Sequence, residues 1–502
     1  MNPLVIGSRR ELLIDPSFIE RFDGASLRLH PPQPQEIAIS FDAPWEGQAP
    51  GYCTVFQDET RCRMIYRIMP PCGCEDQDPR QMTAYAESPD GIHWEKPALG
   101  LFEVDGSTAN NVIWRGNLSH NFTPFLDTNP LCPLEERYKA VGGTKIEWGG
   151  EGLWLMVSAD CIRWRKRDSA PIAFPGNFDS QNLIFWDTAT GCYRAYWRDH
   201  RLQDPLAPDV RDVRTAVSPD LTSWSEPIWL EYNPSRSGSP EADQSDDPSG
   251  DHHQFYSSGV LPYPRAPHFI LGFPQRYCDR GWTVSTDQLP DPDHRRRQAD
   301  QGIGGGRPTR LGTVVTDVLF MASRDGVAFH VWPETLVRPG IQRPGSWYYG
   351  GAWFTWGMLS TQSSLPCAPD ELSIYIQERL APGAQGNLRR HTFRTDGFGS
   401  LNAHLTGGQA LTRPFIFDGD RLSINFSTSG GGRLRIGFQE PSGGEIEGFA
   451  LDDCDLHYGD ELERIVSWKG RQDVTTLCGR PVRMQIELKD ADLYSFAFEV
   501  RK

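Results

Sequence analysis

A seven-residue pattern that recurs along the chain limits the folds open to it. The pattern reads SPDGIHW at 88–94, SADCIRW at 158–164 and SPDLTSW at 218–224, and it returns with Phe in place of Trp as SRDGVAF at 323–329. A fifth, degenerate copy is RTDGFGS, with Asp396 in the aspartate position. A repeat on this scale is typical of a propeller or a solenoid and not of a single globular core.

Each copy of the pattern predicts a β-hairpin. A small residue and a turn-forming Asp connect two strands, and the aromatic residue starts the outgoing strand. The Asp side chain can accept hydrogen bonds from its own turn amides, while the aromatic ring can pack between neighbouring sheets. The motif resembles the Asp-box hairpin of sialidases and other propeller glycosidases, which lies away from the active site. We therefore interpret these aspartates as structural.

The sequence around each copy can be read as four strands. Aromatic and β-branched runs bounded by turn residues precede every hairpin, which predicts five blades. Their first strands begin near residues 51, 120, 180, 254 and 348. An insertion at 278–316, charged and rich in glycine, explains the long fourth interval and is expected to form a mobile surface loop.

The pattern changes after residue 403. Short alternating strands follow without a further copy of the repeat, which favours a separate antiparallel β-sandwich over 404–502. Residues 1–403 would form the propeller, with the N-terminal segment lying over it as an arm. The predicted fold is all-β, a five-bladed β-propeller with a C-terminal β-sandwich.

Composition excludes several classes of protein. A formal net charge of −16 disfavours nucleic acid as a partner. There is no apolar window long enough for a transmembrane helix and no signal-peptide h-region, so we expect no membrane partner and a cytoplasmic location. Eleven cysteines, an odd number, argue against a disulfide framework, and Cys72 and Cys74 have no second pair at zinc spacing.

Several strings along nearly the whole chain are similar to one enzyme family. They are PWEG (44–47), HNFTPFLDTNP (120–130), FDSQN (178–182), RAPH (265–268), TDVLFMASRDG (316–326) and LKDADLYSF (488–496). With the propeller and sandwich, they resemble a bacterial group similar to glycoside hydrolase family 32, the invertases and fructanases. Relatives of that family include arabinan-cleaving enzymes and mannoside phosphorylases.

The resemblance does not extend to the nucleophile motif of fructanases. Their Trp-x-Asn-Asp-Pro has no counterpart in the first blade, where WEGQAPGY stands at 45–52. Their Arg-Asp-Pro is echoed only by Arg198, Asp199 and His200, and their Glu-Cys pair is absent. Fructose specificity is therefore not implied.

Propeller geometry selects the candidate catalytic residues. Residues just before a first strand and just after a second strand lie on the ligand-binding face of the propeller, and glycoside hydrolysis needs two carboxyl groups there. We expect Asp179 to act as base or nucleophile and Glu46 as acid, with Asp199 and Glu378 as substitutes. The alternative for each is a turn cap or an ion pair with a neighbouring arginine.

The same rule selects residues that would bind substrate. Arg67, Arg198, Arg276 and Arg379 would converge from four blades, which suggests an anionic substrate or inorganic phosphate. In the alternative, these arginines pair with Asp199, Asp212 and Glu378. The other predicted binding residues are His120, Asn121, Gln181, Asn182, Asp251, His253 and Tyr348.

These observations favour a glycoside hydrolase acting on a glycan or oligosaccharide. The alternatives are a non-catalytic carbohydrate-binding propeller and a phosphorylase, and a central funnel with a single carboxylate would favour one of these two. No cofactor is expected. The alternative is a central divalent cation held by His120, His252 and His253. The resemblance permits this, because relatives in the arabinan-cleaving family often place a calcium or a water near a histidine at the axis.

Overall fold

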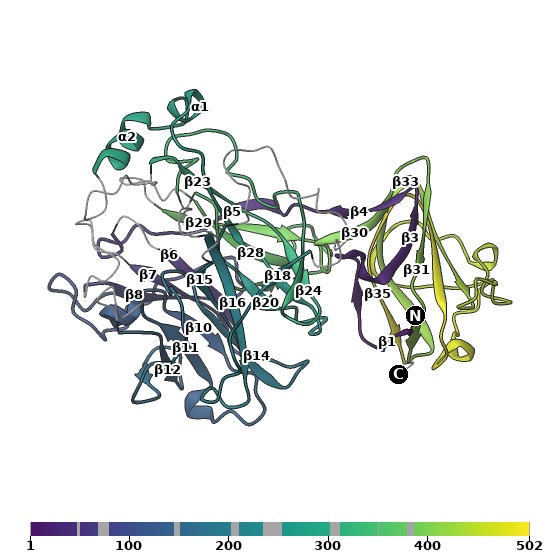
Figure 1. Cartoon of the computed structure of the whole chain (residues 1–502), viewed down its shortest axis with the longest axis horizontal. Coiled ribbons are helices and arrows are strands. Elements are labelled where there is room, and N and C mark those ends of the chain that lie inside the picture. Colours follow the sequence, from purple (N-terminus) through teal and green to yellow (C-terminus); the bar gives the residue numbers. More distant parts are fainter. Residues whose placement is uncertain are drawn as a thin grey trace. The chain divides into compact units, whose positions relative to one another are not determined.

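The computed structural model describes residues 2–47, 51–68, 80–144, 151–201, 210–233, 254–301, 312–349, 351–378 and 386–500. About 49% of the chain is strand and 6% helix, which confirms the all-β prediction. Two compact units are present, and Figure 1 shows the strands of both. Unit 1 comprises residues 1–32, 264–266 and 393–502, and unit 2 comprises 33–263 and 267–392. Among the described residues, no helix is long and apolar enough to cross a bilayer.

The first three blades of unit 2 are four-stranded antiparallel sheets in chain order. Blade one contains β6 (Gly51–Gln57), β7 (Cys62–Ile68), β8 (Met82–Ser88) and β9 (Val112–Arg115). Blade two contains β10 (Thr123–Leu126), β11 (Tyr138–Gly142), β12 (Trp154–Ser158) and β13 (Arg165–Lys166). Blade three contains β14 (Leu183–Asp187), β15 (Cys192–Arg201), β16 (Val210–Ser218) and β17 (Ile228–Trp229).

The fourth blade is divided into two sheets. One contains β18 (Glu231–Tyr232), β25 (Ala328–Val331), β24 (Met321–Ser323), β21 (Ile270–Gly272) and β20 (Val260–Pro262); the other contains β19 (Phe255–Ser257), β22 (Gln275–Asp279) and β23 (Val314–Val318). Two residues explain the break. Gly259 has a φ of 54°, and Pro274 has no N–H to donate to a ladder.

An N-terminal strand completes the fifth blade. β26 (Trp353–Phe354) and β27 (Leu359–Thr361) pair with β28 (Glu371–Glu378), which is followed by β29 (Asn387–Phe393) and then β5 (Gln33–Ser40). We predicted the hairpin at Asp396 as the end of this blade. Asp396 lies instead in unit 1, where its buried carboxylate accepts from Arg265 Nε at 3.0 Å and Ser495 Oγ at 2.7 Å.

The first strands of the blades form the inside of the propeller. β6 contacts β10, and β10 contacts β14. Blade five meets blade one where the Val55 amide donates to Trp356 O at 2.8 Å and the Trp356 amide donates to Cys53 O at 3.0 Å. The ring of blades is therefore closed by backbone hydrogen bonds.

The repeated hairpins are structural, as predicted. In the first, the Ser88 hydroxyl accepts from Gly91 N at 2.9 Å, and Asp90 Oδ1 accepts from the amides of Ile92 and His93 at 2.8 and 2.9 Å. The Trp94 indole donates to Gly91 O at 3.1 Å. Side chains of the preceding blade donate to carbonyls of these turns: Tyr375 to Gly91, Arg63 to Asp160 and Tyr196 to Gly326. The hairpins thus join neighbouring blades.

Unit 1 combines both ends of the chain in strands around one apolar core, and these strands pair antiparallel except for the parallel pair β1 and β32. Its N-terminal strands are β1 (Leu4–Gly7), β2 (Glu11–Leu12), β3 (Ile19–Asp23) and β4 (Ala25–Leu29). They pair with β30 (Gly399–Ala403), β31 (Gly408–Thr412), β32 (Phe415–Phe417) and β35 (Arg483–Glu499), and β35 also pairs with β33 (Arg421–Gln439), whose other partner is β34 (Asp460–Ile465). The expected arm and the boundary at 403 therefore differ from the structure, because the N-terminal strands complete this sheet (Figure 1).

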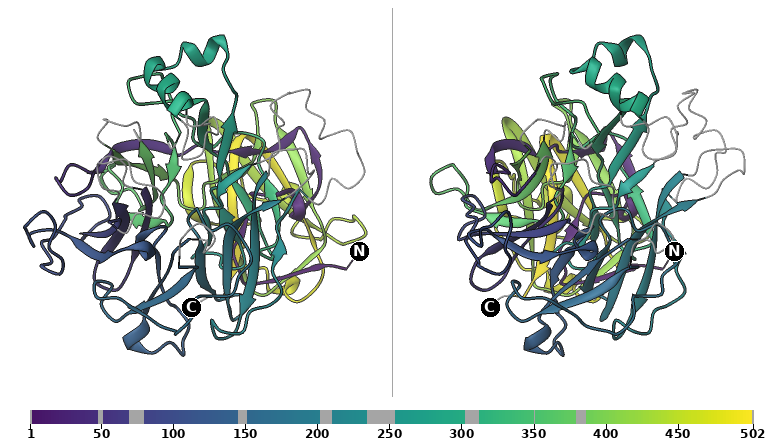
Figure 2. Two further views of the ribbon diagram at one scale, coloured as in Figure 1. Left: turned by 60° about the vertical axis from the view of Figure 1, so that its left-hand side comes forward. Right: turned by 90° about the vertical axis from the view of Figure 1, so that its left-hand side faces the viewer.

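The insertion at 278–316 contains helical structure that we did not predict. Its described part forms α1 (Val284–Asp287) and α2 (Pro292–Gln301). Both helices project away from the strands of unit 2 (Figure 2). α2 is held by the buried side chain of Arg295.

A turn carboxylate shared between blades should contribute measurably to stability. Asp58 accepts from Thr60 N at 2.8 Å, from the Tyr138 hydroxyl of blade two at 2.6 Å, and from Arg63 Nε. Asp58→Asn removes the charge that pairs with Arg63, so we expect a loss of about 2–4 kcal/mol in the free energy of unfolding, measured with urea. The exposed Asp105→Asn variant is the control, and equal stability of the two variants would contradict this role.

Candidate functional site

Side chains from three blades meet around Asp179 on the inside of unit 2. Asp179 lies just before β14, and its Oδ1 accepts from His120 Nε2 at 3.1 Å. Its Oδ2 accepts from Arg198 Nη2 of β15 at 3.2 Å. Arg67 of β7 donates from Nη1 to His120 Nδ1 at 3.3 Å. The predicted residues Asp179, His120, Arg198 and Arg67 are therefore brought together.

The contacts of His120 define its hydrogen-bonding state. A guanidinium can only donate, so Nδ1 of the neutral ring accepts from Arg67 and Nε2 carries the proton donated to Asp179. In the protonated form, the Nδ1 proton would go to Gln81 Oε1, which lies 3.2 Å away. His120 is 1% exposed, so its orientation is fixed by these partners.

Asp179 is ionised at neutral pH. Burial alone would raise the pKa of Asp179, but the charge of Arg198 and the hydrogen bond from His120 outweigh burial and lower the pKa. The side chain of Asp179 is still 19% exposed, whereas those of His120 and Arg198 are 1% and 3% exposed. The carboxylate is therefore the accessible member of this group.

Aromatic side chains surround the same carboxylate. The hydroxyls of Tyr52 and Tyr256 lie 3.1 Å apart, and both rings lie within 5.5 Å of Trp353 between centroids. Tyr349 packs edge-on against Tyr256 and Trp353. Burial raises the pKa of Tyr52 and Tyr349 far above the usual tyrosine value, so these hydroxyls stay protonated.

We refer to this arrangement as the central cluster. Its members are Tyr52, Arg67, His120, Asp179, Arg198, Arg211, Tyr256, Tyr277, Tyr349 and Trp353. The sequence rule did not select Tyr52 and Tyr256, because they lie within first strands and not before them. Tyr52 has a φ of 47° at a register shift in β6, a backbone distortion without a sequence signal.

Glu46 has other partners. Its Oε1 accepts from the Tyr66 hydroxyl at 2.5 Å, and its Oε2 accepts from Lys96 Nζ at 2.7 Å and from Ala43 N at 2.8 Å. The side chain is fully buried. No contact in the described part of the chain joins Glu46 to the central cluster.

The remaining predicted acids form ion pairs with arginines. Asp199 accepts from Arg214 at 2.8 Å, and Glu378 accepts from Arg389 at 2.9 Å. The predicted binding residue Arg276 forms a bidentate pair with Asp317, at 2.6 and 3.0 Å. The alternative of an ion pair with a neighbouring arginine thus fits Asp199 and Glu378. Their partners are not the arginines that we predicted, and Arg276 pairs with Asp317 and not with Asp199, Asp212 or Glu378.

The side-chain amides of three predicted binding residues donate hydrogen bonds to backbone carbonyls. Asn121 Nδ2 donates to Phe178 O at 2.6 Å, and Asn182 Nδ2 donates to the same carbonyl at 3.0 Å. Gln181 Nε2 donates to Cys53 O at 3.1 Å. These amides brace the segment that carries Asp179.

Two predicted binding residues, Asp251 and His253, lie outside the described residues, as do His252 and Arg379. The alternative of a central cation depended on two of these histidines. Across the described ranges, no three His, Cys, Asp or Glu side chains gather in a way that could hold a metal ion.

Tyr348 lies against the insertion. Its ring packs 4.9 Å from the guanidinium carbon of Arg295, a fully buried residue of α2. Arg295 donates to the carbonyls of Pro290, Gly312, Ser346 and Trp347. This side chain therefore ties the insertion to the segment that leads into Tyr349 of the central cluster.

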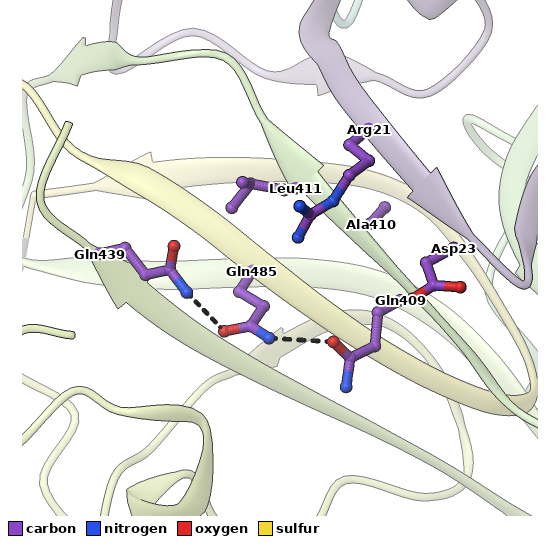
Figure 3. Close-up of a pocket in the computed structure, with 7 residues that line it drawn as sticks. All are labelled: Arg21, Asp23, Gln409, Ala410, Leu411, Gln439 and Gln485. Carbon is purple, nitrogen blue, oxygen red and sulfur yellow. Dashed lines mark hydrogen bonds between the residues drawn. The ribbon is translucent and has the colours of Figure 1, made fainter. Parts of the chain in front are cut away.

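A separate small polar hollow of about 20 Å³ lies on the sheet of unit 1. Gln439 donates to Gln485 at 2.8 Å, and Gln485 donates to Gln409 at 3.0 Å, so the three amides form a row across β33, β35 and β31. Arg21 and Asp23 of β3 also line the hollow (Figure 3). Asp23 is the only acid that lines it.

No protein-family model and no curated protein matches the chain. Among solved structures, it is similar to an N-acetylgalactosamine deacetylase from F. plautii in complex with blood group B trisaccharide (TM-score 0.40, 14% identity, covering 73% of this chain and 96% of that one). It is also similar to a structure reported for the GH130 family of mannoside phosphorylases (TM-score 0.38, 14% identity, 76% and 96%). A third is a family 43 arabinoxylan arabinofuranohydrolase from Bacillus subtilis (TM-score 0.37, 9% identity, 92% and 98%).

The role of Arg295 can be tested through the mobility of the insertion. Arg295→Met leaves four carbonyls without this donor, so we expect faster amide exchange in residues 284–297 and a loss of about 2 kcal/mol or more in stability. Hydrogen–deuterium exchange measures the first and urea unfolding the second. The exposed Arg297→Met variant should behave like wild type, and unchanged exchange in Arg295→Met would refute the role.

The pKa of Asp179 predicts how its contribution to stability depends on pH. A lowered folded-state pKa means that this contribution is complete above the unfolded value of about 3.9 and is lost as the pH falls below it. Asp179→Asn should therefore be less stable by about 2 kcal/mol at both pH 7 and pH 5, with the difference shrinking only below about pH 4. A difference that already shrinks between pH 7 and pH 5 would show that the pKa of Asp179 is raised.

Proposed function

We propose that the protein is a carbohydrate-active enzyme that cleaves glycosidic bonds, and that Asp179 carries the reaction. The observation that supports this proposal is an ionised, partly exposed carboxylate on the inside of the propeller, held by Arg198 and His120 and surrounded by aromatic rings. Aromatic faces suit the apolar faces of sugar rings, and tyrosine hydroxyls can donate to sugar oxygens.

The electrostatics of Asp179 suit a base or nucleophile. A carboxylate with a lowered pKa has no proton to give to a leaving oxygen, but it can activate water or attack an anomeric carbon. His120 and Arg198 fix its two oxygens in place. Asp179 would therefore act as base or nucleophile, and the acid has to be another group.

Glu46 is the least suited of the predicted acids. A general acid must reach the leaving oxygen, whereas the Glu46 carboxyl is fully buried and already pairs with Lys96 Nζ at 2.7 Å. Asp199 and Glu378 are already engaged in ion pairs with Arg214 and Arg389. Asp179 is thus the one carboxylate to which we assign a chemical role.

Two alternative functions are favoured by one observation. Within the described residues, Asp179 is the only carboxylate that contacts the central cluster, while Arg67 has no acidic partner there. Phosphorolysis needs no base, because inorganic phosphate is itself the nucleophile. A propeller that binds carbohydrate without cleaving it would also need no second carboxylate.

Turnover of aryl glycosides and natural oligosaccharides, with and without phosphate, tests the proposal. We expect Asp179→Asn to lower kcat/KM by about 10²–10⁴-fold, and the exposed control Asp168→Asn to match wild type. Free sugar as the product would identify hydrolysis, and a sugar phosphate would identify phosphorolysis.

Two outcomes would overturn the proposal. Wild-type turnover by a folded Asp179→Asn variant would remove Asp179 from the reaction. Binding of sugars without turnover across the panel would favour the binding protein. Glu46→Gln belongs in the same series, because a folded variant without activity would make Glu46 the acid.

A further inference from the structure

Three guanidinium groups of the central cluster lie on aromatic faces. The guanidinium carbon of Arg67 lies 4.5 Å from the centroid of Tyr52, and that of Arg198 lies 4.8 Å from Tyr256. Arg211 of β16 lies 4.1 Å from Tyr277 and 6.0 Å from Tyr256. The hydrogen bond between Tyr52 and Tyr256 connects the three positions.

The cations of the cluster outnumber its anions. Arg198 pairs with Asp179, but Arg67 and Arg211 form no ion pair with any described residue, and their polar contacts are His120 and Gln254. Two positive charges are therefore uncompensated by side chains of the described chain, in a protein whose formal net charge is −16.

The unused donors of these arginines are buried. The Nε atoms of Arg67, Arg198 and Arg211 are inaccessible to solvent and have no hydrogen-bond acceptor. Arg67 and Arg198 are only 9% and 3% exposed as residues. A buried cation without a partner is costly, so such groups are ordinarily paired or bind a ligand.

Other arginines with an unused Nε differ in one respect. Arg201 and Arg421 also lack an acceptor at Nε, yet each has a carboxylate partner, Asp212 at 2.8 Å and Glu499 at 3.5 Å. In the described part of the chain, Arg67 and Arg211 combine an unused Nε with the lack of an acidic partner. These two positions are therefore the unpaired cations of the cluster.

We propose that the central cluster takes a sugar with an anionic substituent, such as the carboxylate of a uronic acid, and that Arg67 and Arg211 bind this group. The inference rests on the proposed function, because it names the substrate class of the same cluster. A guanidinium can donate two parallel hydrogen bonds to a carboxylate, while the aromatic rings contact the sugar face. Arg198 pairs with Asp179, so we do not assign it to the anionic group of the substrate.

Calorimetric titration at low ionic strength tests this inference without relying on turnover. The probes are aryl glucuronides and galacturonides, each compared with the neutral aryl glucoside or galactoside of the same configuration. We expect at least one uronide to bind about tenfold or more tightly than its neutral counterpart, and Arg67→Met or Arg211→Met to remove most of this difference. Arg201→Met, on the same strand as Arg198 but paired with Asp212, is the matched control.

Asp179→Asn separates this inference from the proposed function. The substitution removes the anion that occupies Arg198, so the uronide should bind as tightly as to wild type or more tightly even if turnover is lost. Loss of turnover with retained uronide preference supports both proposals. Unchanged turnover with retained preference would refute the catalytic role alone.

Three results would overturn the anionic-sugar proposal. They are equal affinities for uronides and neutral glycosides, an unchanged preference in both arginine variants, and binding of inorganic phosphate or sulfate but of no uronide. The last result would assign the cations to a free anion. If Arg67→Met does not fold, the result for Arg211→Met decides.

Discussion

Closure of the ring of blades is the constraint on which the rest of unit 2 depends. Backbone hydrogen bonds join Val55 and Cys53 of the first blade to Trp356 of the fifth, and β5 adds the outermost strand of the fifth blade. Between blades, turn carboxylates such as Asp58 and the repeated hairpins accept hydrogen bonds from their neighbours. Because the blades are joined in this way, residues far apart in the sequence are fixed around one point.

The side chains that the ring brings together at that point carry more positive than negative charge. Asp179 accepts from Arg198 and His120, Arg67 contacts His120, and Arg211 lies beyond the tyrosine pair. In such a site the carboxylate of Asp179 is ionised, and the guanidinium groups of Arg67 and Arg211 are free to bind an anion of the substrate. An ionised carboxylate supports the role of base or nucleophile, and the spare cations support an anionic substrate, so both proposals follow from the same electrostatics.

The parts of this arrangement that depend on local sequence could be predicted. The hairpins recur because Ser, Asp and an aromatic residue form the same short-range bonds each time, and the topological rule for first and second strands correctly placed His120, Asp179 and Arg198 near one another. Side-chain direction and long-range pairing could not be predicted. Glu46 follows the same rule, yet it turns toward Lys96 and Tyr66, and the pairing of β5 with β29 joins segments about 350 residues apart. Tyr52 enters the cluster through a positive φ that no sequence pattern indicates.

A crystal structure of the Asp179→Asn variant with a bound oligosaccharide would show directly whether the substrate lies at Asp179. We predict a sugar ring against Tyr52, Tyr256 or Trp353, with its anomeric carbon about 3–3.5 Å from the side chain at position 179. A sugar bound only elsewhere, for example along the glutamine row of unit 1, with position 179 free of contact, would contradict it.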